Sequence, residues 1–191
     1  MAKVQGHGKA SILENNQTEQ LIASAPSPKY ATLWLLQRLT AARVTEALSL
    51  TWGDIRGEVV TFRKATTKTG QTRQVPIAYR LREQLTAYVA HWIATYGDTP
   101  KDNEVLFPTT DSTTQAISRV QAHRTLAKTT KALGLEGVST HTFRRSAATL
   151  AVRAGHGLRD VQALTGHKTL ASLENYLDAD PTVVKSIVND F

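Results

Sequence analysis

Apolar residues recur at helical spacing along most of the chain, and this spacing defines the first predicted elements. A short helix is predicted over residues 17–23, before Pro26 and Pro28 interrupt the chain. A longer helix is predicted over residues 30–50. Its apolar half-wheel consists of Leu33, Leu36, Val44, Ala47 and Leu48.

The pattern then changes to β-branched and aromatic residues, which favour strands. Residues 52–62 and 72–77 are predicted as two strands that a turn at Thr69-Gly70 connects. Helical spacing returns afterwards, and glycines are placed to end two of the later helices. The later helices are predicted over residues 81–95, 115–133, 142–154, 158–165, 170–177 and 181–191. The sequence therefore predicts an α+β fold that is mainly helical, with a small antiparallel sheet in the N-terminal third.

A chain of 191 residues is suited to one domain. Its composition, 41% hydrophobic and 20% charged, is typical of a globular protein. We expect residues 1–16 to form a flexible arm and residues 17–191 to form the domain.

Composition and net charge limit the classes of partner and of chemistry that are open to this chain. The formal net charge of +7 suits a nucleic-acid partner, although a merely basic protein is the alternative. These 191 residues contain no cysteine, which excludes disulfides, thiol catalysis and cysteine-based zinc sites within them. Apolar runs such as Leu33–Leu36 are too short to cross a bilayer, and residues 1–10 do not have the apolar core of a signal peptide. We expect a cytoplasmic protein.

The segment from His141 to Arg145 is the first candidate site. His141 precedes the predicted helix 142–154, Arg144 lies at the edge of its apolar stripe, and Arg145 lies on the opposite side. A helix N-terminus with a cation nearby favours phosphate. A capped surface helix with ordinary cations is the other interpretation.

Arg43 lies within the apolar half-wheel of the predicted helix 30–50. Because a guanidinium keeps its charge, its burial demands an anionic partner. Glu46, one turn away, can be that partner in a purely structural ion pair. Alternatively, Glu46 braces Arg43 as a phosphate clamp.

Two further residues carry little information singly. Lys68 lies in the turn between the two predicted strands, where a lysine is usually just solvated. Tyr176 lies beside the apolar stripe of the helix 170–177, nine residues after His167. Its hydroxyl can reach a cleft, or it is a boundary tyrosine with one polar end.

The order and spacing of these residues resemble the tyrosine recombinase (phage integrase) family from about Leu13 onward. The resemblance rests on Arg43-x-x-Glu46, Lys68-Thr69, His141-x-x-Arg144, Gly166-His167 and Tyr176, together with residues 73–77. Two positions depart from the family pattern: Ala41 replaces a usual glycine, and Thr165 replaces a common leucine. The chain is similar to short members that consist of a catalytic domain alone, such as fimbrial-switch invertases. The alternative is a fragment of a member that carries an additional N-terminal DNA-clamping domain.

This resemblance implies a DNA-cleaving and rejoining enzyme without a metal or other cofactor. Tyr176 is implied as the nucleophile, which forms a 3′-phosphotyrosine and frees a 5′-hydroxyl. Arg43 and Arg144 are implied to hold the non-bridging phosphate oxygens, with Glu46 in support. The other implied roles are a further donor to the phosphate for His167, protonation of the leaving 5′-oxygen for Lys68, and acceptance of the tyrosine proton or phosphate binding for His141.

The implied partners are double-stranded DNA and further copies of the chain, as a dimer to tetramer on DNA, which makes the protein nucleoid-associated. Expected contacts to the DNA backbone are Arg73, Arg119, Arg124, Arg145 and Lys168. The helix 181–191 is expected to dock on its own domain or on a neighbouring protomer. Two other functions stay open: a regulatory or architectural DNA-binding protein with the same fold, and strand relaxation of the type IB topoisomerase kind.

Overall fold

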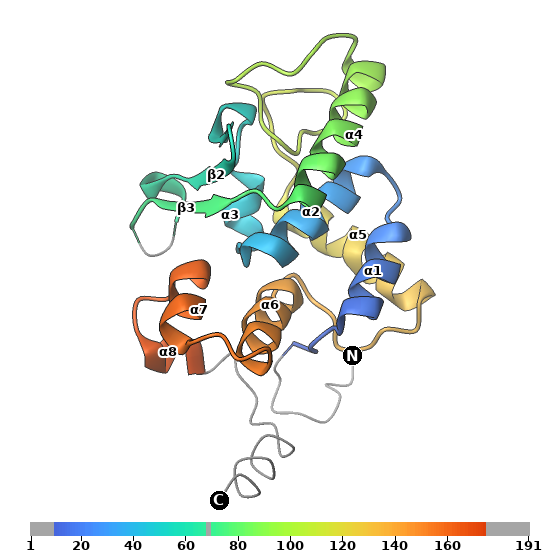
Figure 1. The fold of residues 1–191 in the computed structure, drawn as a ribbon. Coiled ribbons are helices and arrows are strands. Elements are labelled where there is room, and N and C mark those ends of the chain that lie inside the picture. The colour runs from blue at the N-terminus through green and yellow to red at the C-terminus, as the bar shows by residue number, and fades with distance from the viewer. Residues whose placement is uncertain (1–9, 68–69, 175–191) are drawn as a thin grey trace, which may run out of the picture.

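The computed structural model describes residues 10–67 and 70–174. Over this part the chain is mainly helical with a small antiparallel sheet, which confirms the predicted fold class (Figure 1). The helices are α1 (Asn15–Ala23), α2 (Pro28–Thr40), α3 (Val44–Leu48), α4 (Tyr79–Tyr96), α5 (Arg119–Ala132), α6 (Thr142–Arg153), α7 (Leu158–Thr165) and α8 (Leu170–Glu174). The strands are β1 (Ile55–Arg56), β2 (Val59–Phe62) and β3 (Arg73–Pro76), and two single 3-10 turns lie at Trp52–Asp54 and Lys64–Thr66.

The sheet has the order β1-β2-β3, and both pairings are antiparallel. In the second pairing Val60 lies opposite Val75 and Phe62 opposite Arg73. Val60, Phe62 and Val75 are buried, so one face of this hairpin belongs to the core. In Figure 1 the hairpin lies on the same side of the molecule as α7 and α8.

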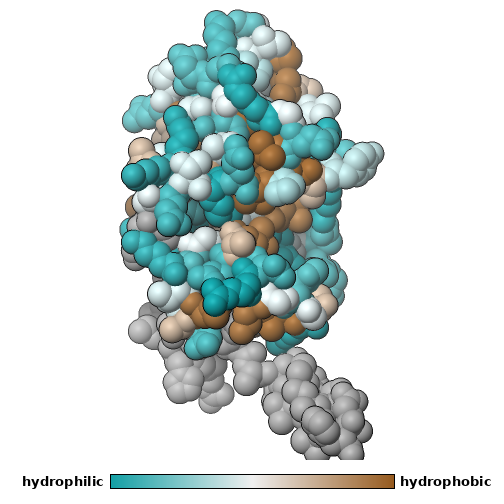
Figure 2. Space-filling view, turned by 60° about the vertical axis from the view of Figure 1, so that its left-hand side comes forward, coloured by the Kyte–Doolittle hydropathy of each residue, from teal (hydrophilic) through white to brown (hydrophobic). Residues whose placement is uncertain are grey.

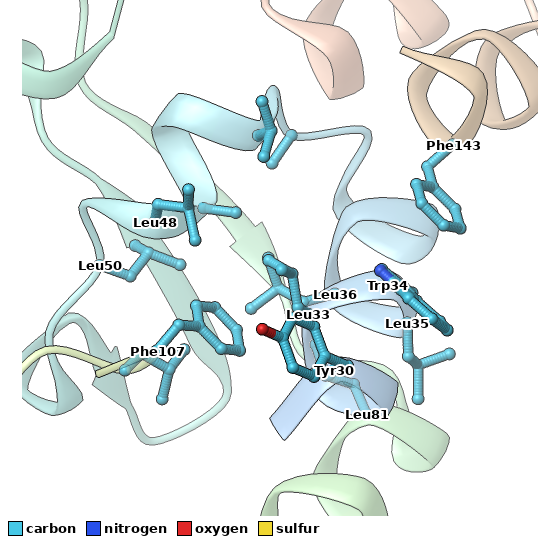
Figure 3. Packing of buried hydrophobic residues seen from close by; sticks show 14 of the residues in the cluster. Tyr30, Leu33, Trp34, Leu35, Leu36, Leu48, Leu50, Leu81, Phe107 and Phe143 are labelled. Carbon is cyan, nitrogen blue, oxygen red and sulfur yellow. The ribbon is translucent and has the colours of Figure 1, made fainter. Parts of the chain in front are cut away.

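Helix α2 is the centre of the core, because its side chains are buried almost all the way round. It packs against α4 on one side and α6 on the other. Figure 3 shows Trp34 of α2 facing Phe143 of α6, and the two rings stack at a centroid distance of 6.5 Å. This packing fixes where α6 begins relative to the C-terminal end of α2.

The predicted continuous helix over residues 30–50 is wrong. Helix α2 ends at Thr40, Ala41 adopts a left-handed conformation with φ of 52°, and α3 begins only at Val44. Both helices bury apolar residues, so the wheel pattern continues across the break and conceals it. The break turns Arg43 into the residue that precedes α3, rather than a residue inside a helix.

The predicted arm over residues 1–16 is wrong for residues 10–16. Leu13 is 2% exposed and belongs to the main core, and its backbone N–H donates to Ser146 Oγ at 2.8 Å. Ser11 pairs with the backbone of Gly137 at 3.0 Å, and Asn15 and Asn16 open α1. One buried leucine in a polar segment was too weak a pattern to predict this docking.

The predicted strand over residues 52–62 is interrupted. Its first residues form a 3-10 turn, and Gly57, with φ of 56°, supports the turn between β1 and β2. The helix expected from residue 115 begins at Arg119, because the Ser118 side chain accepts a hydrogen bond from the N–H of Gln121.

Helices α6, α7 and α8 form a second, smaller cluster through Ala148, Val161 and Leu173. Figure 2, which brings the hairpin side forward, shows a mostly hydrophilic surface with hydrophobic residues confined to a band and to the lower edge. In the described segments no helix combines the length and the apolar character that crossing a membrane requires.

Candidate active site

A pocket of about 750 Å³ opens between the β2–β3 hairpin, the start of α3 and the C-terminal part of α7. Its described lining includes four cationic side chains and one acidic side chain, Glu46. The cations are Arg43, Arg73, Arg159 and Lys168. Such an excess of positive charge in a concave site favours an anion.

Glu46 organises two of these cations. It is 2% exposed, its Oε1 accepts from Arg43 Nη1 at 2.6 Å, and its Oε2 accepts from the Arg43 backbone N–H at 3.0 Å. Arg73 Nη2 lies 3.6 Å from the same carboxylate. A carboxylate that bonds both the backbone and the guanidinium of Arg43 holds that side chain in one orientation. This contact between Glu46 and Arg43 agrees with both interpretations of Glu46, a purely structural ion pair and a brace for a phosphate clamp.

Arg73 of β3 connects the two sides of the pocket. Its Nη1 donates to the carbonyls of Thr40, at the end of α2, and Leu164, in α7. Its guanidinium carbon lies 4.4 Å from the centroid of the Phe62 ring. Gly166, with φ of 66°, leaves room for it, because a Cβ there would lie 3.2 Å from Arg73 Cδ.

Arg144 is fully buried and contacts His167, one of the residues that line the pocket. Its Nη1 donates to the Ala41 carbonyl at 2.7 Å, and its Nη2 lies 3.1 Å from His167 Nε2. The turn after α2, the first turn of α6 and the end of α7 therefore meet at one guanidinium. The structure brings Arg43, Glu46, Arg144 and His167 together.

His167 follows the left-handed Gly166 that ends α7 and is 8% exposed. Its Nδ1 lies 2.7 Å from Thr165 Oγ1, and its backbone carbonyl accepts from the Gln162 side chain at 2.9 Å. Burial lowers the pKa of His167 to about 3, and the positive charges of Arg144, Arg43 and Arg73 contribute to this shift. The ring is therefore neutral near pH 7.

Of the other expected catalytic residues, the structure describes only His141. His141 precedes α6, and its side chain is exposed. Lys68 and Tyr176 lie outside the described residues. Thr67 and Gly70, the described residues on either side of positions 68 and 69 in the sequence, both line the pocket.

The expected DNA contacts divide into two groups. Arg119 and Arg124 are exposed on α5, and Lys168 is exposed at the pocket. Arg73 is held internally, as described above. Arg145 does not project to the surface as we expected: it is 7% exposed and its Nη1 donates to the Ala10 carbonyl. The helical wheel placed Arg145 away from Arg144 but could not show that residues 10–13 cover that side of α6.

Sequence reasoning missed Arg159 and Gln162, which line the pocket from α7. With Ala163 and Gly166 they follow the i, i+3, i+4, i+7 spacing of one helix face, so the polar face of the predicted helix 158–165 was the available signal. Within residues 10–67 and 70–174, no group of three or more histidine, aspartate or glutamate side chains is placed to bind a metal ion.

Solved structures of other proteins have a similar fold. The fold is similar to that in the crystal structure of XerA recombinase, with a TM-score of 0.78 and 20% identity over 98% of this chain and 65% of that one. It is also similar to XerH site-specific recombinase bound to palindromic difH substrate, with a TM-score of 0.77 and 23% identity over 98% of this chain and 55% of that one. The fold defined here is thus one that site-specific recombinases contain.

The sequence comparisons identify the family. The model of the phage integrase family matches residues 11–182, so the chain belongs to the phage integrase family. It is 27% identical to tyrosine recombinase XerC of Erythrobacter litoralis over the whole chain, and 33% identical to XerC of Rhizobium meliloti over 72% of the chain. The chain spans 60% of the first relative's length and 42% of the second's.

Proposed function

We propose that this chain cleaves and rejoins DNA at specific sites through a 3′-phosphotyrosine formed by Tyr176. The observation that carries the proposal is the pocket that Arg43, Glu46 and His167 line, together with the contact between His167 and the buried Arg144. Its excess of cations suits a phosphodiester. Family membership supplies the reaction class, because relatives with matching sequence are named tyrosine recombinases.

The two arginines supply the electrostatic part of this mechanism. Glu46 occupies Nη1 of Arg43, and the remaining N–H groups of that guanidinium are directed to a non-bridging phosphate oxygen. Arg144 contacts the pocket through His167. Preorganised cations of this kind stabilise the charge that develops on phosphorus-bound oxygens in the transition state, a role that metal ions have in other nucleases. The proposed reaction is accordingly metal-independent.

The covalent step exchanges one phosphorus–oxygen bond for another. The Tyr176 oxygen attacks phosphorus, the bond to the 5′-oxygen breaks, and Lys68 gives that oxygen a proton. The exposed His141 ring is the proposed acceptor of the tyrosine proton. Because the new phosphodiester retains the energy of the old one, a 5′-hydroxyl from another strand reverses the step and rejoins DNA.

Recombination exchanges strands between two sites, so it needs several protomers, whereas strand relaxation needs one. We propose that the chain binds double-stranded DNA as a homo-oligomer. Similar folds are known from DNA complexes, among them a lambda integrase dimer bound to a COC′ core site, with a TM-score of 0.68 and 20% identity. The helix expected over residues 181–191, for which docking on its own domain and docking on a neighbouring protomer are both open, lies outside the described residues.

The test uses the full chain and a pool of nicked duplexes that tile the DNA flanking its own gene. A nick next to the cleavage position lets the 5′-hydroxyl fragment diffuse away and traps the covalent complex. We expect a denaturant-resistant protein–DNA adduct in EDTA, and its absence with Tyr176→Phe at unchanged DNA binding. Specific binding without any adduct would favour the regulatory interpretation. On a supercoiled plasmid that carries the same flanking DNA, relaxed topoisomers without recombinants would favour the topoisomerase-like interpretation.

A further inference from the structure

A continuous chain of hydrogen bonds leads from Arg144 into helix α7. Arg144 Nη2 lies 3.1 Å from His167 Nε2, and His167 Nδ1 lies 2.7 Å from Thr165 Oγ1. Thr165 Oγ1 lies 2.7 Å from the Val161 carbonyl and 3.2 Å from that of Gln162. Arg144 is 0% and Thr165 1% exposed, so water does not compete for these contacts.

This chain of hydrogen bonds begins at a guanidinium, that of Arg144, and ends at a carbonyl, that of Val161. The chemistry of these two groups determines where each proton between them lies. A guanidinium has only donors, so His167 Nε2 must accept from Arg144. A neutral ring that accepts at Nε2 carries its proton on Nδ1, and Thr165 Oγ1 must accept that proton. The Thr165 hydroxyl then donates to the Val161 carbonyl, which can only accept.

The opposite tautomer is unfavourable in this arrangement. A proton on Nε2 would face the N–H group of Arg144, and it would leave Nδ1 and the carbonyl competing for one hydroxyl proton. The surroundings also disfavour a charged ring. Among the described residues, the cations near the ring outnumber the acids. The cations are Arg144 of α6, Arg43 before α3, Arg73 of β3 and Arg159 of α7, whereas Glu46 is the one acidic residue in the described pocket lining.

We propose that Thr165 is a positioning residue that fixes the Nδ1–H tautomer of His167, so that the neutral ring presents the Nε2 lone pair to Arg144 and orients its guanidinium. Leucine, which the family commonly has at this position, offers no hydrogen-bonding group. The threonine therefore gives this chain a specific control over the tautomer. In this tautomer the one N–H of His167 is directed to Thr165, so His167 acts through Arg144 and is not the further donor to the phosphate that the family resemblance implies. The consequence for catalysis rests on the proposed function, whereas the tautomer itself does not.

The direct test observes the tautomer. The full chain is labelled with ¹⁵N-histidine, and long-range ¹H–¹⁵N correlations at pH 7.5 distinguish a protonated from an unprotonated ring nitrogen. Loss of one ring system in His167→Gln assigns the His167 signals. We expect Nδ1 to be protonated in the unmodified protein and in Thr165→Ser. In Thr165→Val, which keeps the side-chain shape, we expect a mixture of tautomers or the Nε2–H form. A protonated Nε2 in the unmodified protein would overturn the proposal.

The second arm measures single-turnover formation of the covalent DNA adduct. We expect Thr165→Val to slow it by roughly threefold to tenfold, the scale of one hydrogen bond, and Thr165→Ser to restore it. Adding Thr165→Val to His167→Gln should have no further effect, because Thr165 acts through His167. Thr130→Val is the matched control, since it removes another buried helix hydroxyl, bonded to Ala127 in α5.

The two arms separate the possible failures. If the unmodified protein forms no adduct, the proposed function fails and the NMR arm still decides the tautomer. If it forms adduct and Thr165→Val does so at the same rate, the positioning role fails. If Thr165→Val does not fold, the tautomer in the unmodified protein and in Thr165→Ser decides.

Discussion

The backbone carbonyl of Ala41 accepts a hydrogen bond of 2.7 Å from Nη1 of Arg144, a residue 103 positions later in the chain. Ala41 has φ of 52° and is the one non-glycine residue with positive φ in the segments that the structure describes. The left-handed turn ends α2 and directs this carbonyl towards α6. The placement of Arg43, two residues further on, and of Arg144 thus depends on the same turn.

Replacing Ala41 with glycine should stabilise the protein. A left-handed conformation costs a residue with a Cβ roughly 1–2 kcal/mol, and glycine avoids this cost. Glycine also has greater freedom in the unfolded chain, which lowers the free energy of unfolding by about 0.5–1 kcal/mol relative to alanine. We expect Ala41→Gly to raise the free energy of unfolding by up to about 1 kcal/mol, measured by urea denaturation. Ala47→Gly, in helix α3, is the control and should lower it by about 1 kcal/mol or more. Equal losses in both variants would contradict a strained turn.

Removing Arg43, which lines the pocket, or Arg144, which contacts His167, should impair cleavage far more than binding. We expect Arg43→Ala and Arg144→Ala each to slow adduct formation by roughly 10²-fold or more, the usual scale for one preorganised donor to a developing charge. Arg145→Ala is a matched control for Arg144→Ala, because both remove a buried guanidinium that donates to a carbonyl. It should lower the melting temperature but leave the rate per folded molecule unchanged. A comparable rate loss in Arg145→Ala would mean that the effect is structural.

Arg73 should behave as an internal connection rather than a DNA contact. We expect Arg73→Gln to lower both stability and the rate of adduct formation, since the carbonyls of Thr40 and Leu164 lose their donor. The slope of log binding constant against log salt should not change. Lys168→Gln, which removes an exposed cation, should reduce that slope by about one if this residue contacts a phosphate. A reduced slope in Arg73→Gln with normal cleavage would restore our original assignment of Arg73.

The lowered pKa of His167 should make stability depend on pH. The folded protein binds this proton with a pKa of about 3, against about 6.5 in the unfolded chain. The unfolded state therefore binds more protons between these values, and the contribution of the neutral ring is complete above about pH 6.5 and is lost as the pH falls towards 3. We expect melting temperatures at pH 7.5, 6 and 5 to fall more steeply for the unmodified protein than for His167→Gln. Parallel curves would show that His167 titrates normally.

The sequence predicted most of the helices because their apolar faces are regular. Residues 158–165 were predicted as a helix with its observed bounds, since the apolar spacing is regular and Gly166 ends it. The break at Ala41 escaped prediction, because alanine gives no sign of a left-handed conformation and apolar residues continue on both sides.

The candidate site was predictable as a set of residues and not as a network. The spacing of Arg43, Arg144 and His167 indicated one site. The internal role of Arg73 depends on carbonyls 33 and 91 residues away, a relationship that no local pattern contains. The bond from Thr165 to His167 is local, but the sequence pattern indicates at that position only a departure from the usual leucine.

The proposed mechanism requires that Tyr176 becomes covalently joined to DNA. The most direct measurement is mass spectrometry of the trapped adduct after nuclease and protease digestion, with the full chain and the nicked substrate that yields it. We expect a nucleotide remnant on the peptide that contains Tyr176, linked through the 3′-phosphate, and no adduct at all from Tyr176→Phe. A remnant on any other residue, or an adduct that persists in Tyr176→Phe, would contradict the account.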